Sequence, residues 1–249
     1  MFNTGIIFDM DGLLIDSEPF WCQAEVEIFN DLGVPLEKTM CIQTLGLRID
    51  EVVAHWYTQF PWIDVSPETV SQRLIERVAE RVARYGKAMT GAIEVVELCQ
   101  SLDLPLALAT SSPMILVRST LQRLNLQDTF DVLSSAENED FGKPHPAVYL
   151  TAARDLGIHP SCCIAFEDSI TGMTSAKAAG MKCIVVPAAE ERNNPEFLKA
   201  DRQINSLGDL DHKWFKELLS QNSALNKQRL KNHNFNHNRE NSENEKTCR

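Results

Sequence analysis

The sequence predicts an α/β protein in which a Rossmann-like parallel sheet carries an inserted helical domain. From residue 104 onward, short apolar runs alternate with helical patterns, which is typical of a parallel sheet covered by helices on both faces. The first apolar run ends at residue 8, and the long segment that follows it shows helical patterning without a convincing strand. A chain of 249 residues is long enough for one such core and a smaller second unit.

Five apolar runs are predicted to be strands, at residues 4–8, 104–109, 131–134, 162–166 and 182–186. The helical patterns between the last four runs cover residues 113–124, 145–156 and 171–179. Helices are also predicted at 18–32 and 68–85, and Ser66 followed by Pro67 is typical of an N-cap and a first helical residue. We therefore expect a catalytic core of residues 1–16 and 88–220, with a helical cap domain of residues 17–87.

Composition narrows the expected partners and compartment. The formal net charge of −11 disfavours binding to nucleic acid or to an acidic membrane surface, although a small phosphorylated substrate remains compatible with it. The sequence contains no run of about 18 apolar residues, the length needed to span a bilayer. The seven cysteines show neither a Cys-x-x-Cys pair nor the density of a disulfide scaffold. We expect a cytoplasmic monomer whose residues 221–249, rich in asparagine and charged residues, form a disordered tail.

Polar residues follow four of the predicted strands at the edge where parallel sheets bind their ligands. Because the carboxyl ends of parallel strands share one edge, we expect these side chains to form one site. In chain order the candidates are Asp9 and Asp11, then Thr110, Ser111 and Ser112, then Lys143, and finally Glu167 and Asp168.

Asp9 and Asp11 lie in an Asp-Met-Asp-Gly run that suits carboxylate chemistry on a phosphate ester. One carboxylate can attack phosphorus and form an acyl phosphate, which is the role we assign to Asp9. A second can protonate the leaving alkoxide and later deprotonate water, which is the role we assign to Asp11. The apolar residues after Gly12 exclude a calcium loop of the EF-hand type. A pair of capping aspartates in a polar turn is the plain alternative for this run.

Two carboxylates beside a dianionic phosphate require a compensating cation, and we expect Mg²⁺. Asp9 and Asp168 would each give it one carboxylate oxygen, the backbone carbonyl of Asp11 could face it, and Glu167 is a further or water-mediated ligand. The alternative for Glu167 and Asp168 is simple capping of the next helix, for which Ser169 is suitable.

Thr110 and Ser111 are expected to bind the phosphate through a hydroxyl and an amide, because the helix after them offers free N–H groups to anions. We expect Ser112 to cap that helix with Pro113 at its first position. Lys143 can neutralise Asp9 and the transferring oxygens. In isolation, a Ser/Thr cap and a solvated Lys-Pro turn explain these residues equally well.

The four motifs together resemble those of the haloacid dehalogenase superfamily of phosphohydrolases. They are Phe8-Asp9-Met10-Asp11-Gly12, Thr110-Ser111-Ser112, Gly142-Lys143-Pro144 and Glu167-Asp168-Ser169, with Gly172 following. The resemblance implies an α/β core and a helical cap that closes over the site and selects the substrate. The dehalogenases of this superfamily lack an acid/base residue at the position of Asp11, which leaves a phosphatase or a phosphomutase.

Finer matches are similar to the bacterial hexitol phosphatases, also called 2-deoxyglucose-6-phosphate phosphatases. They are Leu14 to Pro19 with Trp21, Thr44 to Asp50, and Lys143 to Pro146. The resemblance implies small sugar or hexitol phosphates as substrates, with Arg48 of the cap as a possible contact. The main rival is a mutase of the β-phosphoglucomutase kind, but such mutases carry a cap histidine where this sequence has Trp21. A non-catalytic metabolite-binding protein is less consistent with intact Asp9 and Asp11.

Overall fold

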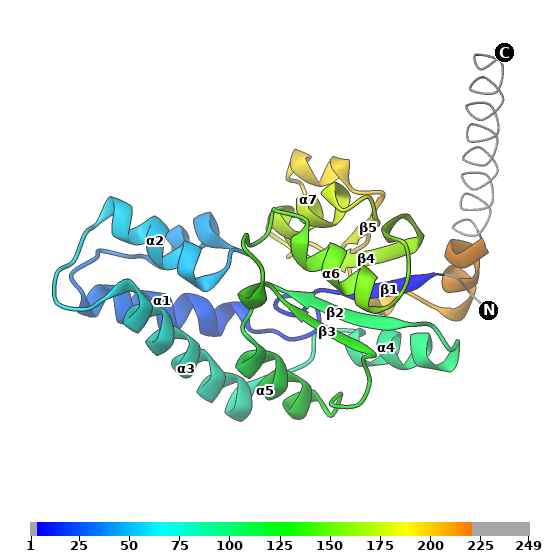
Figure 1. Cartoon of the computed structure of the whole chain (residues 1–249), viewed down its shortest axis with the longest axis horizontal. Helices are drawn as coiled ribbons and strands as arrows, with labels where there is room; N and C mark the ends of the chain where they lie inside the picture. The colour runs from blue at the N-terminus through cyan, green and yellow to red at the C-terminus, as the bar shows by residue number, and fades with distance from the viewer. Residues whose placement is uncertain (1–3, 221–249) are drawn as a thin grey trace, which may run out of the picture.

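A computed structural model describes residues 4–220 of the chain and contains a six-stranded, wholly parallel sheet (Figure 1). The strands run in the order β3-β2-β1-β4-β5-β6 across the sheet. Their bounds are Gly5–Phe8 for β1, Leu106–Thr110 for β2, Val132–Ser135 for β3, Cys163–Glu167 for β4, Lys182–Val185 for β5 and Arg202–Gln203 for β6.

Strand β1 lies at the centre of the sheet, and all four of its residues are buried. It pairs with β2 on one side and with β4 on the other, so that Phe8 is opposite both Leu108 and Phe166. The chain thus adds strands first to one side of β1 and later to the other. A parallel sheet that reverses its strand order in this way opens a crevice at the carboxyl end of the central strand, and Asp9 follows β1 there.

Two apolar clusters cover the faces of the sheet. Along β1, Ile6 and Phe8 point into one cluster and Ile7 into the other, as the two-residue period of a strand requires. Helices α4 (Ala92–Ser101) and α5 (Met114–Leu124) contribute to the first cluster, and α6 (Ala147–Asp155) and α7 (Ile170–Ala178) to the second. The predicted α/β class with helices on both faces is confirmed.

The part of the chain between β1 and α4 is helical, and it lies to the left of the sheet in Figure 1. It contains α1 (Glu18–Asp31), the 3₁₀ helix η1 (Lys38–Thr44), α2 (Ile49–Gln59) and α3 (Pro67–Tyr85). We call residues 17–87 the inserted segment. The Ser66 side chain accepts a hydrogen bond from the Thr69 backbone N–H, which confirms the predicted cap of α3. Every fourth residue of α3 is buried, namely Val70, Leu74, Val78 and Val82.

Among the elements that were not predicted, α2, α4 and β6 each lack a strong pattern in the sequence. Helices α2 and α4 are short and belong to stretches that carry few start and stop signals. Strand β6 has two residues, Arg202 and Gln203, both exposed, so no apolar alternation marks it. The predicted disordered tail lies outside the described residues. Within residues 4–220, no helix combines the length and hydropathy needed to cross a bilayer.

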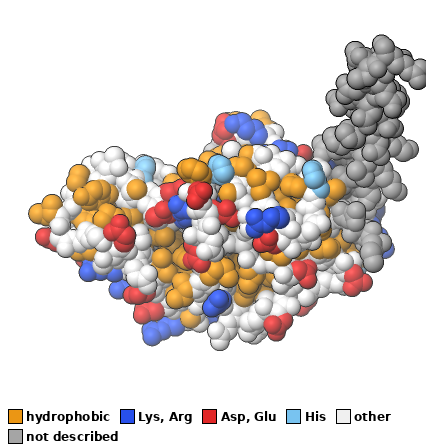
Figure 2. Space-filling view, in the orientation of Figure 1, with side chains coloured by type: hydrophobic (Ala, Val, Ile, Leu, Met, Phe, Trp, Pro, Cys, Tyr) orange, Lys and Arg blue, Asp and Glu red, His pale blue; other side chains and the backbone are white. Residues whose placement is uncertain are grey.

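The surface of the described chain mixes charges of both signs. Acidic residues outnumber basic ones by 11 in the whole sequence. On the face seen in Figure 2, however, acidic and basic side chains are interspersed over both the inserted segment and the core.

Candidate active site

Asp9 and Asp11 leave the end of β1 in a tight turn. The Asp9 backbone N–H donates to Phe166 O at 3.0 Å, which extends the pairing with β4, and Leu14 N–H donates back to Met10 O at 2.9 Å. Gly12 has a φ of +75°, and a Cβ there would lie 2.1 Å from Asp168 Oδ2. A side chain at position 12 would therefore keep the Asp168 carboxylate away from β1.

Lys143 is buried at the centre of the site, with 2 % of its surface exposed. Its ammonium donates to Asp9 Oδ1 at 2.7 Å, to Glu167 Oε1 at 2.6 Å and to the Ala109 carbonyl at 3.1 Å. All three N–H groups thus have acceptors. Burial opposes the charged form of Lys143, but Asp9 and Glu167 outweigh it and raise the pKa above its ordinary value.

Glu167 holds Lys143 in place and is itself completely buried. Its Oε1 also accepts from the Tyr149 hydroxyl at 2.5 Å, while Oε2 accepts from the Asp168 N–H and the Ser169 hydroxyl at 3.2 Å each. The start of α7 packs directly against it, because a Cβ on Gly172 would lie 1.9 Å from Glu167 Oε1. Both carboxylate oxygens therefore already have protein partners, as suits a residue that positions the lysine.

Asp9, Glu167 and Asp168 form the one group of acidic, histidine or cysteine side chains within residues 4–220 whose ligand atoms lie close enough together to hold a metal ion. One carboxylate oxygen from each lies within 4.8 Å of the others. Burial raises the pKa of Asp9 to about 8 despite the opposing Lys143, and burial with the nearby Asp9 raises the pKa of Asp168 well above its ordinary value. The negative charge of three ionised carboxylates is larger than the single positive charge of Lys143 can balance. A donor set made only of oxygens suits a hard divalent cation such as Mg²⁺.

The Asp11 carboxylate lies outside that cluster and is oriented by three donors. The Ser17 hydroxyl donates to Oδ1 at 2.5 Å, and the Trp21 indole N–H donates to the same oxygen at 3.2 Å. The Ser112 hydroxyl donates to Oδ2 at 2.7 Å. The prediction that Ser112 caps α5 is therefore wrong. Pro113 is the N-cap residue, and the Ser112 hydroxyl is bound to Asp11 instead. Ser17 and Tyr149 were not predicted as site residues, because a hydroxyl group just before a helical pattern or within one carries no distinguishing signal.

Thr110 and Ser111 stand at the end of β2 and face the pocket. Thr110 Oγ1 accepts from the Ser112 N–H at 3.0 Å, so its own hydroxyl hydrogen can point toward a ligand. The Ser111 hydroxyl donates to the Gly46 carbonyl of the inserted segment at 2.9 Å, which leaves its backbone amide as the predicted donor. Binding of phosphate by both residues stays a prediction.

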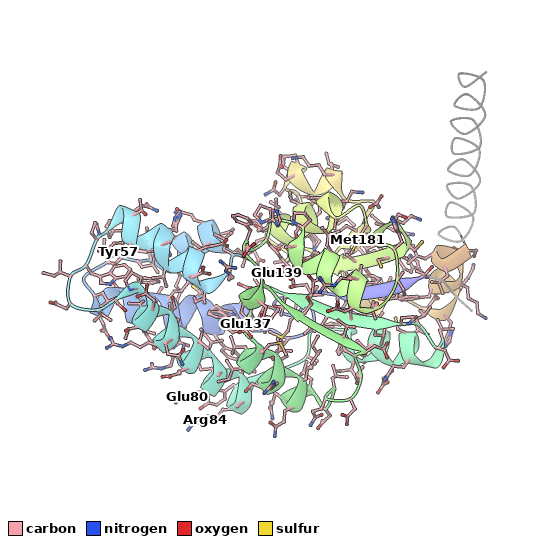
Figure 3. The ribbon with its side chains drawn as sticks, viewed as in Figure 1. Tyr57, Glu80, Arg84, Glu137, Glu139 and Met181 are labelled. Carbon is pink, nitrogen blue, oxygen red and sulfur yellow. The ribbon has the colours of Figure 1, made fainter. Side chains whose placement is uncertain are left out.

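Arg48 binds protein groups on both the inserted segment and the core. Its guanidinium binds both carboxylate oxygens of Asp50, at 2.6 and 2.8 Å, and donates to the carbonyls of Ala136 and Glu139 at 3.0 and 2.7 Å. Glu139 lies where the inserted segment meets the core (Figure 3). Four of the five N–H groups of the guanidinium thus bind protein acceptors, and Arg48 does not line the pocket. Arg48 thus links the inserted segment to the core, and its contact with a substrate stays a prediction.

A cavity of about 550 Å³ lies over these residues. Its base is formed by the strand ends and includes Asp9, Asp11, Lys143 and Asp168, and its opposite wall comes from α1 and η1. A buried ammonium and hydroxyl donors beside a cluster of carboxylates that could hold a cation suit a phosphate monoester better than an uncharged substrate. The fold and the pocket therefore define an α/β enzyme that handles phosphate esters.

The chain belongs to the haloacid dehalogenase-like hydrolase family, whose model matches residues 6–186. It is 45 % identical to hexitol phosphatase B of Escherichia coli K12 over 208 residues, which cover 83 % of this chain and 94 % of that protein. The crystal structure of CbbY from Rhodobacter sphaeroides with phosphate matches at a TM-score of 0.76 and 27 % identity, covering 84 % and 96 % of the two chains. A β-phosphoglucomutase from Clostridium difficile shares the fold at 19 % identity and a TM-score of 0.77, covering 87 % and 97 %. The predicted superfamily and the prediction of a phosphatase are confirmed.

Proposed function

We propose that the protein is a Mg²⁺-dependent phosphatase of small sugar or hexitol phosphates that works through an aspartyl-phosphate on Asp9. The observation that carries the proposal is the separate environment of two neighbouring carboxylates. Asp9 is paired with Lys143 inside the acidic cluster, whereas Asp11 is held outside it by hydroxyl and indole donors. One carboxylate is thereby suited to attack and metal binding, and the other to proton transfer.

In the first half-reaction, Asp9 attacks phosphorus and the ester P–O bond breaks. Lys143 engages Oδ1, which leaves Oδ2 as the attacking oxygen. The departing alkoxide takes a proton from Asp11, and the product alcohol leaves. In the second half-reaction, Asp11 takes a proton from water, the water oxygen attacks phosphorus, and the acyl phosphate bond breaks to restore Asp9 and release phosphate. Lys143, the Thr110 hydroxyl and the Ser111 amide stabilise the charge on the transferring oxygens.

Asp9 and Asp168 would hold the Mg²⁺, and Glu167 would support the site through Lys143. The bound ion supplies positive charge that the single lysine does not provide against three carboxylates and a phosphate. With that charge present, Asp9 would be ionised and able to attack, which its burial alone disfavours.

We propose that the inserted segment, residues 17–87, is a cap over a core of residues 1–16 and 88–220. The side chains of this cap would select the class of substrate. The wall that α1 and η1 give to the cavity carries carboxylate, hydroxyl, thiol and ammonium groups, which suit a hydroxylated substrate. The likeness to hexitol phosphatase B supports hexitol phosphates and 2-deoxyglucose 6-phosphate as the first substrates to test.

The proposal is tested by phosphate release from a panel of hexose, 2-deoxyhexose and hexitol phosphates, with Mg²⁺ or with EDTA. Metal-dependent turnover is expected for the wild type and should be lost in Asp9→Asn, whereas Asp128→Asn on the exposed surface should retain it. Absence of metal-dependent release from every member would refute the function. Conversion of β-glucose 1-phosphate to glucose 6-phosphate without free phosphate, primed by the 1,6-bisphosphate, would establish the mutase instead. That outcome is disfavoured because Trp21 occupies the position of the mutase histidine.

A further inference from the structure

One face of the first two turns of helix α1 lines the cavity. Glu18, Trp21, Cys22 and Glu25 all border it, at the spacing of a single helical face. Trp21 contacts Asp11 at the reacting end, and Glu25 lies one turn further along the helix. From Glu18 to Glu25 the helix rises about 10 Å. That distance is comparable with the length of an extended six-carbon phosphate ester.

Glu25 is a buried carboxylate without a cation. It is 6 % exposed, and no ion pair to it is found within residues 4–220. Burial raises its pKa to about 7, and hydroxyl and indole groups nearby only partly oppose the shift.

The hydrogen bonds available to Glu25 are weak. The Thr44 hydroxyl lies 3.5 Å from Oε2, but the same hydroxyl is only 3.1 Å from the Cys41 carbonyl, and it has a single hydrogen to give. The Trp56 indole N–H is near enough to oppose the rise in the pKa of Glu25, but it is buried without a partner that meets hydrogen-bond geometry. The Glu25 carboxylate is therefore left with most of its accepting capacity unused.

Such an arrangement is costly for the folded protein. A buried charge that lacks a partner loses its hydration without full compensation, and an apolar side chain of similar size is often as stable or more so. A group of this kind is expected where a ligand supplies the missing hydrogen bonds, as in pockets that are mainly apolar with a few polar groups. Thr44, which is also buried and lines the cavity, adds a hydroxyl oxygen beside the Glu25 carboxylate.

We propose that Glu25 and Thr44 form a specificity subsite that binds hydroxyl groups of the substrate at the end remote from its phosphate. The proposal rests on the phosphatase function proposed above and narrows its substrates to phosphate esters with a hydroxylated chain. A pocket built to bind a hydroxyl group discriminates strongly against an analogue that lacks it, because the buried acceptor is then left unpaired.

The experiment compares Glu25→Met, which fills the space without an acceptor, with Glu25→Gln, which restores a carbonyl acceptor. The substrates are a hexitol 6-phosphate and p-nitrophenyl phosphate, which carries no hydroxyl group. Glu25→Met should lower the ratio of kcat/KM for the hexitol phosphate to that for p-nitrophenyl phosphate by about 10- to 100-fold, the range of a hydrogen bond to a charged group. Glu25→Gln should recover part of this loss. Glu27→Met is the matched control, because Glu27 is on the same helix but binds Arg77 and Arg81 outside the cavity.

The melting temperature separates recognition from a structural role. Removing an unpaired buried carboxylate should leave the Tm of Glu25→Met equal to or above that of the wild type. An unchanged substrate ratio, or a lowered Tm with equal losses on both substrates, would overturn the subsite. If the wild type hydrolyses p-nitrophenyl phosphate but no sugar or hexitol phosphate, the proposed function fails, and the subsite fails with it as a consequence. A wild type active on hexitol phosphates with an unchanged Glu25→Met ratio rejects the subsite alone.

Discussion

Replacement of Lys143 by methionine should reveal how strongly the acidic cluster depends on one cation. The side chain is 2 % exposed, and its ammonium lies 2.7 Å from Asp9 Oδ1 and 2.6 Å from Glu167 Oε1. Methionine fills similar space but leaves both buried carboxylates without their counter-ion. Removing one partner of a buried ion pair typically costs about 3–5 kcal/mol of the free energy of unfolding. At an m-value of about 2 kcal/mol/M, the urea midpoint should fall by about 2 M.

Lys177→Met provides the matched control. Lys177 lies 2.7 Å from Asp201, but both side chains are more than one third exposed, so the same substitution should cost at most about 1 kcal/mol. Urea unfolding of the three proteins, followed in EDTA so that no cation replaces the lysine, measures the difference. In a Lys143→Met/Glu167→Gln double variant, part of the loss should be recovered because one uncompensated charge is removed. A midpoint shift for Lys143→Met no larger than that for Lys177→Met would refute the reasoning.

Three further predictions concern other parts of the site. Gly172→Ala should destabilise the protein by about 1–3 kcal/mol and reduce turnover, because the new methyl group would meet the buried Glu167 carboxylate. Gly157→Ala is the control, since open space surrounds Gly157 and the substitution should cost only backbone strain of about 1 kcal/mol. Equal urea midpoints for the two variants would contradict this prediction. Asp11→Asn should lower kcat by about 10²- to 10⁴-fold yet leave Mg²⁺ affinity, measured by calorimetry, near the wild-type value; lost affinity would instead make Asp11 a metal ligand through its side chain. The pKa of Glu25 rises from 4.5 to about 7 on folding, so the folded state binds the proton of Glu25 more tightly than the unfolded state does. The free energy of unfolding that this contributes is fully present below pH 4.5 and is lost as the pH rises through 7. Between pH 4.5 and 8 the wild type should therefore lose about 3 kcal/mol more unfolding free energy than Glu25→Gln, and parallel pH profiles of urea unfolding would disprove the shift.

The sequence was sufficient to predict the strands that carry the site. Asp9, Lys143 and Asp168 are far apart in the chain, yet parallel pairing brings the carboxyl ends of β1 and β4 to one edge, and the apolar runs before them are visible in the sequence. The roles of these residues in catalysis and metal binding stay predictions. Exposed β6 was missed because two polar residues carry no strand pattern.

The direction of a polar side chain was harder to predict than its position. Ser112 was correctly placed at the end of β2, but whether its hydroxyl caps a helix or binds Asp11 depends on the path of the turn after β1. Arg48 likewise belongs to the inserted segment, but the two core carbonyls that it binds are near it only in the folded protein. Tyr149 lies within an ordinary amphipathic helix, and only the tertiary structure shows that its hydroxyl meets Glu167.

The hydrogen-bond donors around Asp11 come from both the inserted segment and the core. Ser17 and Trp21 belong to the inserted segment, whereas Ser112 belongs to the core. A rotation that moved α1 away from the sheet would remove two of these three hydrogen bonds and leave the carboxylate free to turn. The proposed proton carrier is thus oriented only when the two parts are docked. An open enzyme could bind phosphate at Thr110 and Ser111 and still lack an oriented acid for the leaving group.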